Sequence, residues 1–343
     1  MQKDMHYYGT YAIARAAGIL PEAAQIIASA SQFVDDNAVK EVINFSDNAS
    51  LYSRPTAHKC ENIKNTDDDD QRVVWVPFHF LPGGEGSTFE EKIKCIKDSE
   101  IANKMVANHI NKTDKKFYIA LLGVTAHVYA DTFSHYGFSG LSSDINNINI
   151  PTIELAPDSS NFFDETITKV KAGTAEILSG FLGHGGVATY PDWPFLEWEF
   201  DYENGEKNSR KNLDTFMEGS KALHNMFRTA CELHSDLYQG SHRSFEQIEA
   251  SLKDILSFNG DEEERIENWK EKFQDDSANF TETKEVILEY LGDKWNAERK
   301  AMDDNSHSSI VENSPLFNFY KAASYHRHYV LRDLLPDHGI VVS

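Results

Sequence analysis

Hydrophobic residues recur along most of this chain in the patterns expected of α-helices. One segment starts with Pro21, which suits the first turn of a helix, and repeats small apolar residues as far as Asp36. A second, residues 117–136, opens with an almost wholly apolar run and is expected to be a buried helix. Further helices are predicted near residues 89–110, 163–181, 210–238, 244–257, 262–274, 282–302 and 315–334.

Evidence for β-strands is confined to one run. Residues 73–80 are rich in valine and aromatic side chains, but Pro77 interrupts them. We therefore predict an all-α fold, a multi-helix bundle with long loops. Residues 1–240 are expected to form the main helical domain, and residues 241–343 a C-terminal helical extension packed on it. A single domain over the whole chain is the alternative.

The charge of the chain limits the partners that it can bind. Among 343 residues, 55 acidic and 33 basic side chains give a net charge of −22 at pH 7. Such a surface repels the phosphate backbone of nucleic acids, so we predict no nucleic-acid partner. No segment of this sequence reaches the ~20 consecutive apolar residues of a transmembrane helix, so we predict no transmembrane segment.

The first residues and the cysteines bear on where the protein is made. Residues 1–6 lack the apolar stretch of a signal peptide. This predicts synthesis in the cytoplasm, with export or delivery to a host by a route that needs no cleaved signal left open. Cys60, Cys95 and Cys231 lie far apart and in no recognised motif, so they are predicted to be reduced thiols.

The segment that follows the apolar run at residues 117–124 carries the most informative chemistry. His127, Asp131 and His135 stand at positions i, i+4 and i+8. In a continuous helix each is rotated about 40° from the last, with roughly 6 Å of rise, so all three lie on one face. Two imidazoles and a carboxylate suit a borderline metal ion such as zinc. The alternative is a helix whose polar face contacts solvent or other polar groups.

Other histidines and a pair of aspartates are candidates to complete such a site. Asp35 and Asp36 close a helix, where two carboxylates oppose the helix dipole; a bound cation would compensate them, and so would exposure to solvent. The candidate histidines lie among aromatic, glycine or proline residues. They are His6, His58, His79 and His184. Multinuclear hydrolytic sites draw their ligands from several helices and loops in this way.

Other catalytic classes lack their usual motifs. The chain has no Gly-x-Ser-x-Gly nucleophile elbow and no His-Glu-x-x-His zincin motif. Its glycine-rich segments at residues 83–86 and 183–186 match neither a P-loop nor a dinucleotide-binding fingerprint. Metal-assisted hydrolysis is therefore the leading interpretation.

Several stretches resemble a family of bacterial metal-dependent phospholipases C, which includes secreted and host-directed enzymes of Gram-negative bacteria. The stretches are residues 6–11, the helix end at residues 32–36, and residues 126–140. A later block of the family is similar to residues 183–192. The resemblance runs over most of residues 5–200, and little of it extends beyond residue 240.

More distantly, the order of the candidate ligands along the chain resembles that in the all-α zinc-dependent phospholipases C and single-strand nucleases, which hold three zinc ions. The ligands that this resemblance implies are His6, Asp35 or Asp36, His58 or His79, and His127 with Asp131. The chain departs from these relatives in two places. His135 follows Asp131 by only four residues, and Ala188 stands four residues after His184, where the relatives have glutamate. Asp192 is the candidate substitute.

The resemblance also implies the cofactor and the substrate. Two or three zinc ions are expected, with Mn²⁺, Fe²⁺ and Ca²⁺ as alternatives. In the distant relatives a processed N-terminal amine is also a metal ligand, whereas here Met1 precedes His6 with no processing signal. The expected substrate is a zwitterionic phospholipid at a membrane surface.

Together these features predict a metal-dependent phosphodiester hydrolase whose site lies within residues 1–240, with a phospholipase C as the leading hypothesis. Metal ions would bind the phosphate oxygens and lower the pKa of a bridging water. Asp131 is the expected bridging ligand, and Asp35 or Asp36 a ligand or general base. Two alternatives stay open: a nuclease or phosphomonoesterase on the same scaffold, and a metal-stabilised binding or effector protein without turnover.

Overall fold

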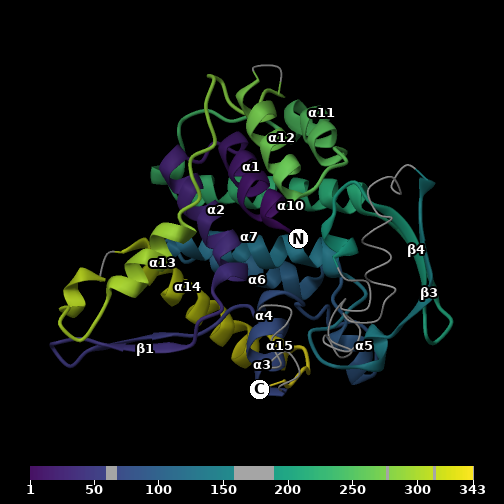
Figure 1. Ribbon diagram of the computed structural model, residues 1–343, viewed down its shortest axis with the longest axis horizontal. Helices are drawn as coiled ribbons and strands as arrows, with labels where there is room; N and C mark the ends of the chain where they lie inside the picture. Colours follow the sequence, from purple (N-terminus) through teal and green to yellow (C-terminus); the bar gives the residue numbers. More distant parts are fainter. Residues whose placement is uncertain (59–67, 158–188, 276–277, 312–313, 343) are drawn as a thin grey trace.

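Helix α7 (Tyr118–His135) runs through the middle of the molecule, and other helices pack against it (Figure 1). These are α2 (Pro21–Asp36), α6 (Glu100–Ile110), α10 (Asn212–Leu233) and α14 (Pro315–Tyr329). The computed structural model describes residues 1–58, 68–157, 189–275, 278–311 and 314–342. The N-terminus lies beside α7 in this central region (Figure 1).

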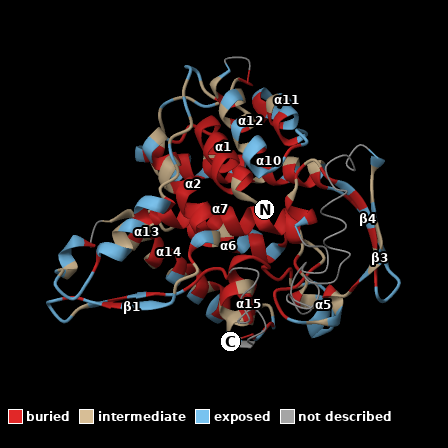
Figure 2. Ribbon diagram, viewed as in Figure 1, coloured by how far each residue is buried: buried red, intermediate tan, exposed pale blue. Residues whose placement is uncertain are grey.

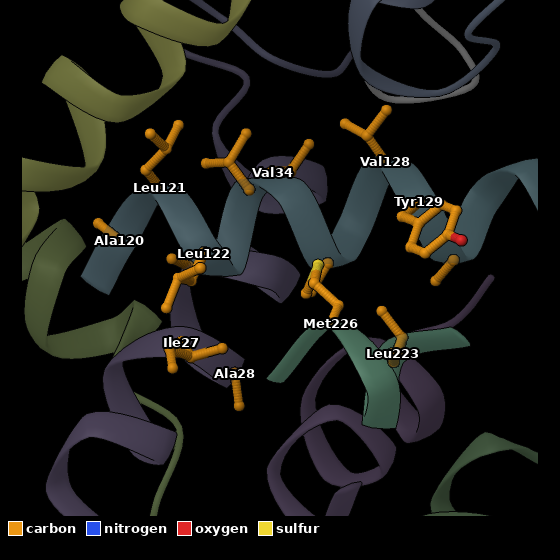
Figure 3. Packing of buried hydrophobic residues seen from close by; sticks show 14 of the residues in the cluster. Ile27, Ala28, Val34, Ala120, Leu121, Leu122, Val128, Tyr129, Leu223 and Met226 are labelled. Carbon is orange, nitrogen blue, oxygen red and sulfur yellow. The ribbon is translucent and has the colours of Figure 1, made fainter. Parts of the chain in front are cut away.

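α7 is buried because its sequence is apolar around almost its whole circumference. Every residue of the helix except Ile119 is buried, and Figure 2 shows buried residues along its length. A helix of this kind is stable only inside a core. Figure 3 shows apolar side chains of α2, α7 and α10 packed together, among them Ile27, Leu122 and Met226.

Gly123 allows α2 to approach α7 closely. A Cβ atom at this position would lie 2.3 Å from the main-chain oxygen of Ile27 and 2.6 Å from Cβ of Ala30. Both separations are shorter than van der Waals contact, so only glycine fits without moving one of the helices. The separation of the two helices is therefore set by this residue.

Four helices match the predicted bounds to within one residue. They are α2, α7, α11 (Phe245–Leu256) and α12 (Glu262–Gln274). Ser244 and Asp261 explain the sharp starts of α11 and α12, because each forms a capping box with the third residue of its helix.

Other predicted helices are shorter or divided. Residues 89–110 form α5 (Phe89–Ile93) and α6, and residues 282–302 are helical only in α13 (Gly292–Ala301). The helix predicted near residues 163–181 lies outside the described residues. Other helical elements are η1 (Asp4–Gly9), α1 (Thr10–Ala16), η4 (Asp144–Asn146), η7 (Tyr190–Asp192), η8 (Ser235–Leu237), η10 (Ser308–Ile310), η11 (Val330–Leu334) and α15 (Leu335–Asp337).

The prediction of an all-α fold is wrong, because the structure contains two antiparallel sheets. One is a hairpin, and the other has the order β3-β4-β5. The strands are β1 (Glu41–Asn44), β2 (Ser50–Ser53), β3 (Ile148–Leu155), β4 (Glu197–Tyr202) and β5 (Lys207–Lys211). β4 alternates acidic residues with Trp198, Phe200 and Tyr202, which are buried in a second, smaller apolar cluster. This period of two is typical of a half-buried strand.

The strand-like run at residues 73–80 is helical instead. It lies in η3 (Gln71–Trp75) and α4 (Val76–Phe78), which follow α3 (Asp68–Asp70). Pro77 stands in the first turn of α4, where the missing N–H costs nothing. A short apolar run fits a buried helical turn as well as a strand, and packing decides between them.

Buried residues from both sides of residue 240 belong to one hydrophobic cluster, which extends from Met1 to Val342. The boundary at residue 240 stays a prediction. Cys95 and Cys231 are buried free thiols, and Cys60 lies outside the described residues. Within the part of the chain that the structure describes, no helix combines the length and apolarity needed to cross a membrane.

Gly123→Ala is expected to destabilise the protein by about 1–3 kcal/mol, because the added methyl group must push α2 away from α7. The free energy of unfolding in urea measures this loss. Gly219→Ala in α10 is the control, since there the nearest atom, at 3.2 Å, belongs to the side chain of Phe133 and not to the main chain of a neighbouring helix. An equal loss in the two variants would contradict the close approach of α2 and α7.

Candidate metal centre

α7 presents His127, Asp131 and His135 on one face, which confirms the arrangement that their spacing predicts. Oδ2 of Asp131 lies 3.3 Å from Nε2 of His127 and 3.5 Å from Nδ1 of His135. All three side chains are buried. A buried carboxylate needs hydrogen bonds or an opposite charge, because the burial of an isolated charge is very costly.

Two other segments bring candidate ligands to this face. Asp35 lies in the last turn of α2, and His79 directly follows α4. Nε2 of His79 donates to the main-chain oxygen of Thr56 at 2.8 Å. This bond leaves Nδ1 of His79 directed at Asp35 and Asp131, at 3.7 and 3.5 Å. Metal-binding histidines are commonly oriented by such a bond from the second ring nitrogen.

Five of the six separations among donor atoms of these four residues are close to those of a tetrahedral site. Nδ1 of His79 and Nε2 of His127 are 3.3 Å apart. Oδ1 of Asp35 lies 3.7 and 3.8 Å from these two nitrogens, and Oδ2 of Asp131 lies 3.5 and 3.3 Å from them. Bonds of about 2.0–2.1 Å to a tetrahedral zinc ion place neighbouring ligand atoms about 3.4 Å apart. Asp35, His79 and His127, whose donor atoms all lie within 4.8 Å of one another, therefore fit one zinc ion, and Asp131 lies beside it.

His6 extends the group on the other side of Asp131. Its Nε2 lies 3.2 Å from Oδ1 of Asp131, and its ring stacks on that of His127 with 3.9 Å between centroids. Both nitrogens of His6, Nδ1 of His127 and Oδ2 of Asp131 are buried without a hydrogen-bond partner. Buried polar atoms are seldom left unpaired in proteins, so this set indicates a ligand that these atoms bind.

Among the described residues, two overlapping groups hold candidate ligand atoms within 4.8 Å of one another. They are His6, His127 and Asp131, and Asp35, His79 and His127. His127 belongs to both groups, so the two positions for an ion are adjacent.

The amino group of Met1 lies between two carboxylates. It is 2.8 Å from Oδ1 of Asp131 and 3.0 Å from Oδ1 of Asp192 in η7. Burial favours the neutral amine, but the two carboxylates outweigh this effect and raise the pKa of the amine to about 11. Asp192 also contacts Nε2 of His135, at 3.0 Å. The ammonium thus compensates part of the negative charge around Asp131.

The protonation states of His6, His127 and Asp131 suit a cation, whereas the pKa of His79 is raised by its hydrogen bond to Asp131 although burial opposes this. Burial lowers the pKa of His127 well below its usual value and also lowers that of His6, so both rings are neutral at pH 7. Although burial opposes it, His135 helps to hold the pKa of Asp131 well below its usual range. Burial raises the pKa of Asp35 to about 8. Neutral imidazoles and carboxylates are the forms that bind metals, so a cation would stabilise the ionised Asp35.

The other predicted ligands lie in different surroundings. Asp36 accepts a hydrogen bond from the hydroxyl of Tyr290. His58 lies beside Asp70, with 3.1 Å between Nε2 and Oδ2. His184 lies outside the described residues. In the alternatives that the sequence left open, the geometry thus favours Asp35 over Asp36 and His79 over His58.

A family model described as a family of unknown function, DUF6765, matches residues 1–334. The chain belongs to this family. No curated protein and no solved structure matches it. The match includes the N-terminal segment and α7, so all the candidate ligands fall within it.

Zinc is expected to raise the melting temperature of the protein, because a ligand that binds only the folded state stabilises it. His127→Ala and Asp131→Ala should abolish both this rise and the zinc content found by elemental analysis, while helical content stays largely intact. His328→Ala, which alters an exposed histidine of α14, is the control and should behave like the wild type. Full zinc binding by either variant of α7 would exclude this centre.

Proposed function

We propose that this chain is a metal-dependent phosphodiester hydrolase, and specifically a phospholipase C. The observation that carries the proposal is a pair of adjacent donor groups, one formed by Asp35, His79 and His127 and the other by His6, His127 and Asp131. Hydrolytic metal sites are commonly built from such donors. The lipid substrate is supported by the resemblance of the surrounding segments to bacterial phospholipases C.

The donor types favour zinc among the ions that the sequence left open. Imidazole nitrogens suit zinc and iron, whereas Mn²⁺ and Ca²⁺ prefer carboxylate, carbonyl and water oxygens. When bound, such an ion lowers the pKa of a coordinated water and polarises a phosphoryl oxygen. The second position, beside His6, has fewer protein donors and leaves room in its coordination shell for water or phosphate.

Two aspartates are suited to bridge the metal positions and to handle the attacking water. Asp131 directs one carboxylate oxygen toward His127 and the other toward His6, so it is suited to bridge two positions. Asp35 is 31% exposed, whereas Asp131 is 1% exposed. Asp35 has the more exposed side chain of the two, so we propose that a phosphodiester approaches from its side. From this position Asp35 can orient the attacking water or accept its proton.

The same geometry favours a second candidate function. Oδ2 of Asp131 lies 3.3 and 3.5 Å from the nitrogens of His127 and His79, so it could join Asp35 as a fourth ligand of the same ion. Four protein ligands close a structural zinc site, whereas a catalytic site keeps a position for water. A metal-stabilised binding or effector protein is therefore the alternative. A nuclease is less favoured, because the net charge of −22 opposes the approach of a nucleic acid.

Phosphatidylcholine vesicles are expected to be hydrolysed to diacylglycerol and phosphocholine, in a reaction that stops on chelation and resumes with zinc. Single-stranded DNA, assayed in parallel, should remain intact. A protein that binds zinc tightly and cleaves no phosphodiester would favour the structural alternative. Cleavage of DNA instead of lipid would favour the nuclease.

Asp35 and Asp36 form a matched pair for mutation. Asp35→Asn is expected to lower kcat/KM by at least about 100-fold, because it removes a ligand or base. Asp36→Asn should have a smaller effect, since an amide oxygen still accepts the bond from Tyr290. Steady-state hydrolysis of the same vesicles measures both. Equal losses would contradict the distinct roles of the two aspartates.

A further inference from the structure

Residues beyond 260 contact each of the elements that bring candidate ligands to α7. η1 carries His6, α2 ends at Asp36 directly after Asp35, and α4 is followed by His79. We propose that Tyr290, Arg265, His326 and Arg327 are positioning residues of the metal centre. This inference rests on the proposed metal site and identifies the residues that set its geometry from outside.

Tyr290 holds the end of α2. Its hydroxyl donates to Oδ2 of Asp36, the neighbour of the candidate ligand Asp35. The segment that carries Tyr290 is also fixed to η1, because the hydroxyl of Tyr7 donates to the main-chain oxygen of Leu288 at 2.6 Å. Since Asp35 and Asp36 share the last turn of α2, a displacement of one moves the other.

Arg265, in α12, holds the N-terminal segment. Its side chain is 2% exposed, and its Nε donates to Oδ2 of Asp4 at 2.7 Å. A second nitrogen of the guanidinium donates to the side chain of Gln2. The guanidinium also lies 5.4 Å from the ring centre of Trp193, the residue after Asp192. These contacts hold Gln2 and the start of η1, and they place Arg265 beside Trp193, which follows Asp192.

Two neighbouring residues of α14 hold α4 and the loop near residue 55. Nε2 of His326 donates to the main-chain oxygen of Pro77 at 2.6 Å. Nε of Arg327 donates to the oxygen of Val73 at 2.7 Å, and a second nitrogen donates to the oxygen of Pro55. A single turn of α14 thus connects two segments that are distant in the sequence.

The contacts of α14 fix both His79 and the group that orients it. Pro77 stands two residues before His79, and Pro55 directly precedes Thr56. The oxygen of Thr56 accepts the hydrogen bond from Nε2 of His79. Outer residues of this kind commonly change metal affinity by about 10–100-fold when they are replaced, because they hold the ligands in place.

Tyr290→Phe and Tyr325→Phe test this inference as a matched pair. Each removes one hydroxyl that donates to a side chain, and Tyr325 donates to Asn108 of α6, at 2.8 Å, away from the ligands. Zinc affinity is measured by competition with a chelator, and ligand geometry by the visible spectrum of the Co²⁺ form. Tyr290→Phe should weaken zinc binding about 10-fold or more and shift the spectrum. Tyr325→Phe should change neither.

Arg265→Lys and Arg327→Lys keep the charge but lose the planar fork that makes two directed bonds. Arg15→Lys is their control, because Arg15 is equally buried but bonds to Glu285. Both test variants should weaken zinc binding about 10-fold more than the control does. If a lysine variant fails to fold, zinc binding by Tyr290→Phe decides whether the positioning role holds.

The outcomes separate this inference from the proposed function. Wild-type zinc affinity and an unchanged cobalt spectrum in Tyr290→Phe would overturn the positioning role. A wild-type protein that binds no metal would overturn both proposals. A third outcome is a wild type that binds zinc and cleaves no phosphodiester, while Tyr290→Phe binds zinc more weakly. This result would overturn the proposed hydrolase function and support the positioning role.

Discussion

A carboxylate buried inside an apolar helix is the constraint on which this structure depends. Asp131 is 1% exposed, and α7 is covered by other helices along its length. An unpaired charge in such a place costs several kcal/mol, so the fold must bring partners to it. The partners come from distant parts of the chain: the Met1 amine, His6 and His79. The amine of Met1 is buried beside Asp131, at 2.8 Å from its Oδ1.

The packing of the core and the geometry of the centre depend on each other, because α7 takes part in both. Its apolar side chains pack against α2 and α10, while its polar face carries the candidate ligands. Gly123 lets α2 come so near that a methyl group would not fit between the helices. The same approach brings Asp35, eight residues after Ile27 in α2, within reach of His127. A change in helix separation would therefore alter the distances between donor atoms as well as the stability of the core.

The parts of the structure that follow from local spacing could be predicted, and those that follow from contacts across the chain could not. His127, Asp131 and His135 are four residues apart on one helix, so their common face follows from helix geometry alone. The sequence also identified Asp35 and His79 as candidates, but it left Asp36 and His58 as equal alternatives, because only packing shows which side chain faces α7. The run at residues 73–80 has the composition of a strand and folds as a helix. By contrast, the alternation of acidic and aromatic residues in β4 is visible in the sequence and is typical of a strand. No local pattern marks the Met1 amine, which meets Asp131 across 130 positions.

The contacts around the centre show why residues beyond 240 matter although none of the candidate ligands lies among them. η1 has six residues and α4 has three, and helices this short are unstable by themselves. Neither can hold a histidine in a fixed orientation without contacts from a longer element. α12 and α14 supply those contacts through Arg265, His326 and Arg327, all of them buried. A division into a catalytic part and an appended helical part would separate the candidate ligands from the side chains that hold them. The centre is therefore better described as a property of the whole chain than of residues 1–240.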